Sequence, residues 1–147
     1  MISQKQTIAA VWFVVSLVLM LTGSASEAYA QKRGTTVGQV NGTPSGAPNT
    51  TVRLEAGLSV APSVSWGYWQ CLSGPVKLYY ASGSNWVYVA QANASGCYGL
   101  PNSYGKAVFN FRIPSSARRN AYLRVRYEYP GNSWYYSSVG YGNVYVR

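Results

Sequence analysis

Side chains that commonly act as catalysts or metal ligands are scarce in this 147-residue sequence, which contains no His and no Asp. Without an imidazole, neither a Ser-His-Asp nor a Cys-His arrangement can take the proton from a nucleophile. His-based zinc sites and EF-hand calcium loops are excluded because their ligands are missing. No glycine cluster lies between a strand pattern and a helix pattern, so no phosphate-cradling loop is indicated. We therefore expect no cofactor and no metal.

One catalytic arrangement remains open, in which Glu55 and Glu128 form the carboxylate pair of a glycosidase. Both residues fall on the polar phase of an alternating segment, where a solvent-facing acid is the usual outcome. We expect the protein not to be an enzyme.

Aromatic and basic side chains are abundant, and they indicate binding. Segments 66–69 and 134–136 place rings on both phases of a strand pattern, whereas a two-layer sheet buries only one phase, so some rings should be exposed. Rings next to Arg suit stacking on sugars or bases beside an anionic group. The candidate binding residues are Trp66, Tyr68, Trp134, Tyr136, Arg112, Arg118, Arg119, Arg124 and Arg126. Two alternatives stay open: cross-strand pairing of tyrosines on an outer surface, and ordinary solvated arginines.

The net charge is +9, from 12 Lys and Arg against 3 acidic residues. Such a protein is attracted to phosphate, sulfate, uronate and anionic lipid surfaces. The alternative is that the charge keeps a tyrosine-rich β protein soluble. We expect no specific nucleic acid among the partners.

The N-terminal segment has the pattern of a cleaved signal peptide. Lys5 precedes an apolar run at 8–21, and the Ala-Tyr-Ala sequence at 28–30 predicts cleavage after Ala30. An uncleaved anchor is the alternative, but the run is shorter than the ~20 residues that a spanning helix needs. No later run is long enough to span a bilayer. We expect the mature chain, 31–147, to be secreted to an extracellular or periplasmic location.

Cys71 and Cys97 are an even pair in a chain with an export signal, which indicates a disulfide; two free thiols in a reducing compartment are the alternative. Residues 31–49 are rich in Gly, Thr, Ser, Pro and Asn, and this composition predicts a flexible linker. The folded domain would then comprise residues 50–147.

The clearest structural signal is the segment 121–129. Leu123, Val125 and Tyr127 alternate in it with charged residues, which is the period of a strand that has one face in a core and the other in water.

Other segments predict further strands around this one. They lie at 50–60, 64–72, 76–80, 86–91, 107–113, 134–139 and 142–146. Residues 81–85 predict a hairpin turn, and 92–106 predict a long loop that Cys97 pins to the Trp66–Cys71 region. Trp69 is expected to be buried against the disulfide, as in many sandwich cores. No helical period is sustained, so we expect an all-β sandwich of about seven or eight strands.

From Gly74 onward, the sequence resembles the small immunoglobulin-like (Ig-like) repeat domains of bacterial surface and secreted proteins. The segments that carry the resemblance are 76–80, 86–89, 109–113, 122–127, 130–132, 135–138 and 144–146. The turn after Gln91 is longer than usual in such domains, carries Cys97 and lacks an acidic residue often found there. The resemblance implies an Ig-like antiparallel β-sandwich with a spacer, adhesion or binding role.

Together, these patterns predict a secreted, non-catalytic binding or adhesion module. Its partner would be an extracellular or envelope glycan or protein, anionic partners included, contacted through exposed rings and Arg. One alternative is a small basic secreted antimicrobial or inhibitor-type effector that acts on anionic surfaces. Another is a structural subunit that assembles through its strand edges.

Overall fold

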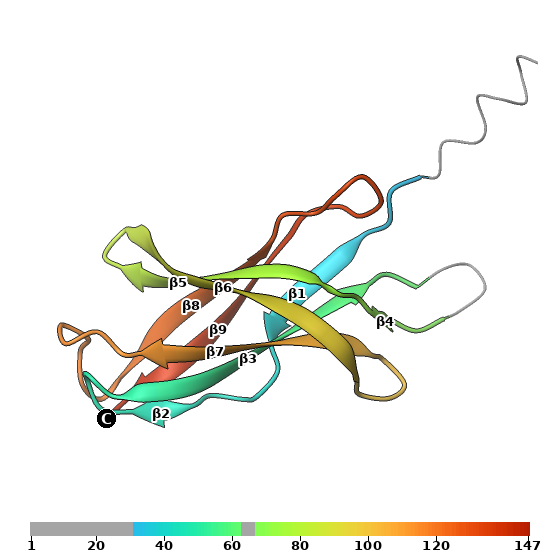
Figure 1. Ribbon diagram of the computed structural model, residues 1–147. Helices are drawn as coiled ribbons and strands as arrows, with labels where there is room; N and C mark the ends of the chain where they lie inside the picture. The colour runs from blue at the N-terminus through green and yellow to red at the C-terminus, as the bar shows by residue number, and fades with distance from the viewer. Residues whose placement is uncertain (1–30, 63–66) are drawn as a thin grey trace, which may run out of the picture. The chain divides into compact units, whose positions relative to one another are not determined.

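The structure, a computed structural model, describes residues 31–62 and 67–147, of which Lys32–Arg147 form one compact unit (Figure 1). The described residues form strands, turns and loops, and no helix that could cross a membrane is found among them. The strands are β1 (Thr35–Gln39), β2 (Ser45–Gly46), β3 (Thr51–Val60), β4 (Gln70–Cys71), β5 (Gly74–Ser82), β6 (Asn85–Tyr98), β7 (Tyr104–Arg112), β8 (Ala121–Tyr129) and β9 (Ser138–Val146). The all-β prediction is confirmed. The predicted signal peptide, residues 1–30, lies outside the described residues.

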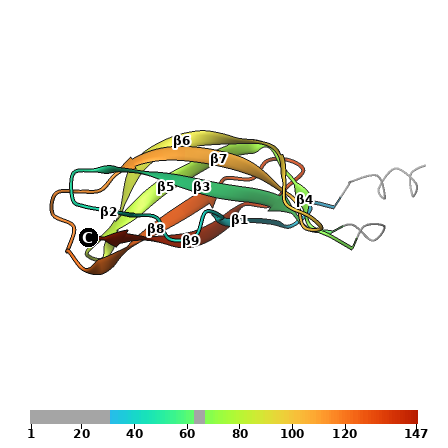
Figure 2. The same cartoon turned by 90° about the horizontal axis from the view of Figure 1, so that it is seen from below.

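The strands belong to one curled, mixed sheet in the order β1-β3-β7-β6-β5-β8-β9-β2, with β4 paired to β3. Neighbouring strands are antiparallel except β2 and β9, which are parallel. The long strand β6 is shared by both halves, because its first part pairs with β5 and its last part with β7. The curl places β3 and β7 opposite β8 and β9, as Figure 2 shows.

The hydrophobic core lies between these two halves. In β8, Val125, Tyr127 and Tyr129 are buried while the charged residues between them face outward, as the alternation predicted. The ring centre of Phe109 in β7 lies 6.1 Å from that of Tyr127 in β8, so side chains of the two halves pack against each other. Fully burying one such side chain stabilises the fold by about 1.5–3 kcal/mol.

The prediction that residues 31–49 form a flexible linker is wrong, because this segment contains β1 and β2. Strand β1 pairs with β3 along its whole length, and β2 pairs with the end of β9. Val37 of β1 is buried in the core. The segment is poor in apolar residues, but its main chain is satisfied by neighbouring strands, and this compensates for the lack of side-chain burial.

On its other side, β1 lies against β9. Gln39 of β1 donates a hydrogen bond from Nε2 to the carbonyl oxygen of Asn143 (3.0 Å), and its Oε1 accepts one from the hydroxyl of Tyr127 (2.9 Å). Burial raises the pKa of Tyr127, so its hydroxyl stays a proton donor. At Gly140 the strands are so close that a Cβ atom would overlap the carbonyl oxygen of Val37. A glycine is therefore required there for β1 to seat on β9.

The predicted disulfide is present and joins Cys71 of β4 to Cys97 of β6, with a sequence separation of 26. Of the strand predicted at 64–72, residues 64–66 lie outside the described chain, and the described part forms only the two-residue strand β4. Trp69 is only half-buried and is not part of the core, so its predicted burial against the disulfide is wrong. It lies instead beside a loop, where its backbone N–H donates to Asn102 Oδ1 (3.0 Å).

The hairpin predicted around 81–85 is confirmed as the β5–β6 turn, but two strand boundaries differ from the prediction. The predicted loop at 92–106 is largely strand, because β6 continues to Tyr98 with Ala94 buried, and β7 begins at Tyr104. The two strands predicted at 134–139 and 142–146 are one strand, β9, which starts at Ser138.

Candidate binding face

The outer surface of β6, β5, β8 and β9 gathers aromatic and arginine side chains from four strands. We call it the aromatic–arginine face and define it by Tyr79, Trp86, Tyr88, Arg124, Arg126 and Tyr141. Leu78 and Val125, the neighbours of Tyr79 and Arg124 along their strands, are fully buried. The period of two along each strand therefore points the face residues to the outside.

Strand register explains how these residues meet. Across the antiparallel pairs, Tyr79 lies opposite both Tyr88 and Arg126, and Arg126 lies opposite Tyr141. Trp86 lies opposite Ala81, a small residue, so that the indole can extend over β5 toward β8. The ring centres of Trp86 and Tyr141 are 5.8 Å apart, although β6 and β9 are separated by two strands. The two side chains must therefore lie along the sheet surface rather than stand upright from it.

The two arginines lie among these rings. The guanidinium carbon of Arg124 is 4.3 Å from the ring centre of Tyr141 and 6.0 Å from that of Trp86. The guanidinium carbon of Arg126 is 5.7 Å from Trp86 and 5.9 Å from Tyr79. A cation over a ring face is stabilised by about 0.5–1 kcal/mol at an exposed site, which favours this arrangement over free rotation.

Arg126 is engaged within the protein. Its Nη2 forms an ion pair with Glu128, and its buried Nε has no hydrogen-bond partner among the described residues. Burial raises the pKa of Tyr79, and a hydrogen bond with Glu128 together with its negative charge raises it further. Arg126, Glu128 and Tyr79 are thus held in place by one another.

Arg124 differs from Arg126 in its polar contacts. It is exposed, and in the part of the chain that the structure describes it makes no ion pair and no side-chain hydrogen bond. The rings of Tyr141 and Trp86 orient the guanidinium group of Arg124, while its N–H groups remain available to a ligand.

The face presents rings to solvent. A pocket of about 230 Å³ lies beside it, next to the turn between β8 and β9, and is lined by Lys77, Glu128, Pro130 and Ser137 among others. Pockets for drug-sized ligands are usually about 300–1,000 Å³. Tyr88 and Tyr141 are 54% and 48% exposed. The geometry therefore suits a ligand that lies along the surface.

The aromatic–arginine face contains only two of the binding residues predicted from the sequence, Arg124 and Arg126. Arg112 ends β7 in the other half of the sheet, so it does not share their face. Arg118 and Arg119 are exposed in the loop between β7 and β8, at the end of the molecule near Arg112.

The remaining predicted aromatics lie elsewhere. Trp134 and Tyr136 are exposed in the connection between β8 and β9, and Tyr68 is exposed just before β4. Trp66 lies outside the described residues. These rings are at the end of the sheet that carries the disulfide, whereas Trp86 is at the other end of β6.

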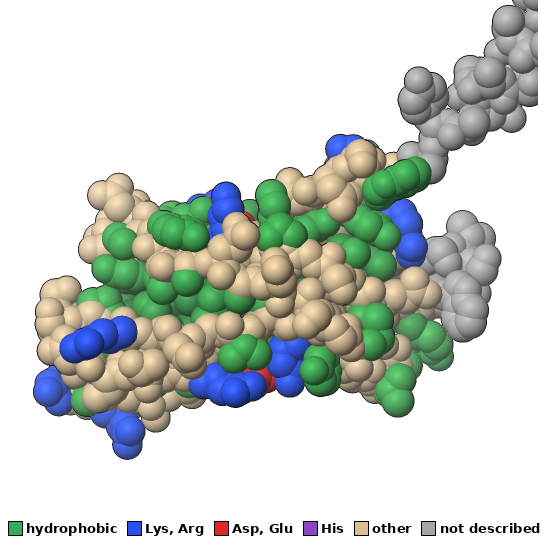
Figure 3. Space-filling model, viewed as in Figure 1, with side chains coloured by type: hydrophobic (Ala, Val, Ile, Leu, Met, Phe, Trp, Pro, Cys, Tyr) green, Lys and Arg blue, Asp and Glu red, His purple; other side chains and the backbone are tan. Residues whose placement is uncertain are grey.

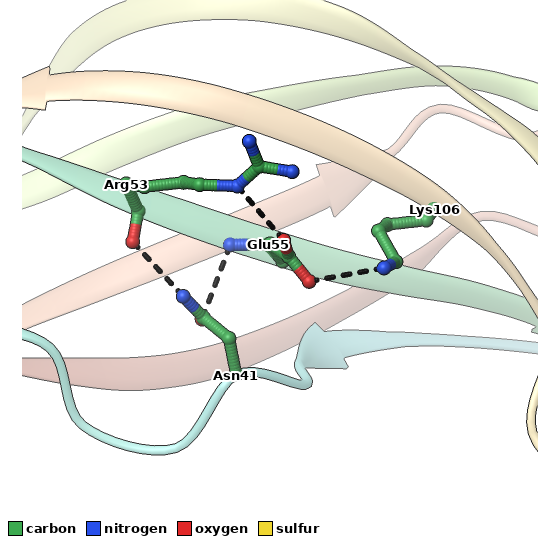
Figure 4. Close-up of polar contacts among 4 residues, drawn as sticks. All are labelled: Asn41, Arg53, Glu55 and Lys106. Carbon is green, nitrogen blue, oxygen red and sulfur yellow. Dashed lines mark hydrogen bonds and ion pairs between the residues drawn. The ribbon is translucent and has the colours of Figure 1, made fainter.

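The two glutamates do not form a carboxylate pair. Glu55 lies on the outside of β3, where Arg53 Nε donates to its Oε1 (2.9 Å) and Lys106 Nζ is 3.2 Å from its Oε2 (Figure 4). The hydrogen bond from Arg53, followed by that from Lys106, lowers the pKa of Glu55. Glu128 faces outward from β8 in the opposite half of the sheet. The glycosidase arrangement considered above therefore does not exist in this fold.

Sequence reasoning missed four residues of the face: Tyr79, Trp86, Tyr88 and Tyr141. Tyr79, Trp86 and Tyr88 fall in predicted strands and Tyr141 falls between two of them, but local patterns do not reveal which strands are neighbours. The sequence does predict that Arg124 and Arg126 face outward from their strand. Residues that face outward from the adjoining strands must lie beside them.

No protein-family model matches the sequence, and no curated protein matches it at a significant level.

Proposed function

We propose that the protein is a secreted, non-catalytic binding module with an Ig-like fold, whose partner is an extracellular or envelope polymer. The observation that carries the proposal is the aromatic–arginine face, where three strands supply rings around two arginines that a fourth strand, β8, provides. Tyr and Trp are enriched at interfaces, and larger exposed apolar patches mark interaction sites.

The strand order supports the Ig-like part of the proposal. Ig-like sandwiches place strands A, B, E and D in one sheet and C, F and G in the other, with a further strand C′ beside C in the variable type. The order β1-β3-β7-β6 fits the first sheet and β6-β5-β8-β9 the second, with β6 serving as both C′ and D. The disulfide differs, because it joins β4 to β6 rather than strands B and F.

Two observations support secretion. A disulfide persists in oxidising compartments outside the cytosol, and Cys71 and Cys97 are bonded. The sequence at 28–30 also fits a signal-peptidase site.

Among polymers, a glycan fits the face better than a protein does. The rings of Trp86 and Tyr141 lie along the sheet surface, which suits the flat faces of successive sugar rings. A protein partner would instead be expected to insert side chains into a well-packed pocket, whereas Tyr88 and Tyr141 of the face are exposed to solvent.

The test is co-sedimentation of the 31–147 product with insoluble polymers: cellulose, peptidoglycan sacculi and cross-linked alginate. Trp86→Ala should weaken binding about 30-fold, because truncating a central aromatic anchor costs about 2 kcal/mol or more. The matched control is Trp134→Ala, which removes an indole that is 62% exposed outside the face and should leave binding unchanged. The proposal fails if no polymer binds, or if Trp134→Ala weakens binding and Trp86→Ala does not.

The second candidate, a basic effector that acts on anionic surfaces, is favoured by one observation. Arg112, Arg118 and Arg119 gather at one end of the molecule, while the acidic groups of the described chain are paired with cations elsewhere. In Figure 3 the few visible acidic side chains likewise lie directly beside basic ones. An effector of this kind should permeabilise vesicles of anionic lipid, with an activity that falls steeply with salt.

A further inference from the structure

We propose that the aromatic–arginine face recognises an acidic glycan, and that Arg124 binds the carboxylate or sulfate group of the sugar. This inference rests on the function proposed above and names the chemistry of its ligand. It follows from the different states of the two arginines on the face.

Arg124 has the geometry of an anion receptor. Its guanidinium is held 4.3 Å from the ring centre of Tyr141 and is bordered by Trp86, so its orientation is restricted before any ligand arrives. A guanidinium presents five N–H donors in a fixed fork that matches a carboxylate or a sulfate with two parallel hydrogen bonds. In the described part of the chain, none of these donors is used by the protein.

Arg126 serves a different purpose. Because its charge is countered by Glu128, it offers an incoming anion little net attraction. Its guanidinium carbon lies 5.7 Å from the ring centre of Trp86. Arg126 thus supports the indole from β8, the strand that pairs with β5. Arg126 is thus a positioning residue, and Arg124 is the residue left to contact the ligand.

The register places a second polar group next to Arg124. Asn143 of β9 lies directly opposite Arg124, and it is exposed. An amide at this point can donate to and accept from sugar hydroxyl groups, which a guanidinium alone cannot do. Aromatic rings, an amide and a guanidinium together match the ring faces, hydroxyls and acidic group of one sugar unit.

The charge distribution of the whole chain agrees with an anionic ligand. The net charge is +9, and the acids of the described residues, Glu55 and Glu128, are both in ion pairs. An acidic polymer is therefore attracted over long range and then meets a face where one guanidinium is unpaired.

The test compares polymers that differ only in their acidic groups: alginate against carboxyl-reduced alginate, and dextran sulfate against dextran. The wild-type 31–147 product should bind an acidic polymer at least about tenfold more tightly than its neutral counterpart, because hydrogen bonds to charged groups are the strong ones. Arg124→Gln should reduce this preference to the part that the remaining net positive charge supplies, and should leave binding to the neutral polymer unchanged. Preference for alginate assigns the ligand group as a carboxylate, and preference for dextran sulfate assigns it as a sulfate.

Two control variants complete the design. Arg112→Gln removes an exposed arginine from β7 in the other half of the sheet and should preserve the preference. Arg124→Lys keeps the charge but loses the fork, so it should resemble Arg124→Gln; full preference in Arg124→Lys would overturn recognition by the guanidinium. Circular dichroism of each variant verifies that it is folded.

The outcomes separate the two proposals. Equal binding to acidic and neutral polymers, lost in Trp86→Ala, would overturn the acidic-glycan inference and leave the binding function in place. An unchanged preference in Arg124→Gln would likewise overturn the role of Arg124. Absence of binding to all four polymers would overturn the acidic-glycan inference, and absence of binding to cellulose and peptidoglycan as well would overturn the binding function.

Discussion

At the scale of single residues, the same side chain has different roles according to what lies beside it. Arg124 and Arg126 are two positions apart on one strand and face the same way, yet only Arg126 has a carboxylate within reach, because Glu128 follows it on the same face of β8. Glu55 shows the converse case, a single acid that two cations share. On a protein with few acids, the placement of each one decides which cations remain available to a ligand.

Glu55 gives a prediction for stability against pH. Its pKa is lowered from 4.5 in the folded protein, chiefly by the hydrogen bond from Arg53, so the unfolded chain binds the proton more readily. The stabilisation is present in full above pH 4.5 and is lost as pH falls through the lower folded-state value. Urea unfolding at neutral pH and at about pH 3 should therefore show a smaller loss of stability in Glu55→Gln than in the wild type. An equal loss in both proteins would show that the ion pairs of Glu55 do not stabilise the fold.

At the scale of elements, the alternating strands were predictable and the supporting ones were not. In β8 and in the first half of β3, apolar residues occupy every second position and burial follows that pattern, whereas residues 56–60 of β3 are all buried. β1 and β2 have almost no apolar residues. They are ordered instead by pairing with β3 and β9, and local sequence does not reveal such pairing. β6 was predicted too short, since its last part is rich in Asn, Ser and Gly, and its pairing with β7 outweighs that composition.

The candidate site shows the same division. The phase of Arg124 and Arg126 could be derived from β8 alone, whereas the contact between Trp86 and Tyr141 depends on the strand order and on the small size of Ala81. Neither of these is encoded in a local pattern.

The close packing of β1 against β9 can be tested by adding a methyl group at Gly140, where the two strands approach each other. Gly140→Ala would overlap the carbonyl oxygen of Val37, so it should lower the free energy of unfolding by about 1–3 kcal/mol. Gly38→Ala is the matched control in β1, because no atom lies within 4 Å of the added methyl group, and its effect should stay within about 0.5 kcal/mol. Equal effects of the two variants in urea unfolding would contradict the contact.

At the scale of the molecule, one curled sheet separates the disulfide from the aromatic–arginine face. The disulfide and the exposed rings of Tyr68 and Trp134 lie at one end, while Trp86 and Arg124 lie toward the other, over the strands that enclose the core. Changes at the disulfide end should therefore affect unfolding without altering the face.

Removal of the disulfide tests this separation. The double variant Cys71→Ser/Cys97→Ser opens a loop with a sequence separation of 26, which on the chain-entropy account lowers the free energy of unfolding by about 3 kcal/mol. Polymer binding measured well below the unfolding temperature should be unchanged. If binding is lost while the protein remains folded, the site lies at the disulfide end and not on the aromatic–arginine face.

The position of β1 between β3 and β9 also bears on when the protein can fold. β3 follows β1 closely in the chain, but β9 is made more than a hundred residues after Thr35, as the bond from Thr35 Oγ1 to Ser138 Oγ illustrates with its separation of 103. During synthesis, β1 can therefore contact β3 early, but it can contact β9 only after nearly the whole chain has been made. The sheet therefore cannot close from its N-terminal strands alone, and an edge of β1 stays uncovered until β9 has been made.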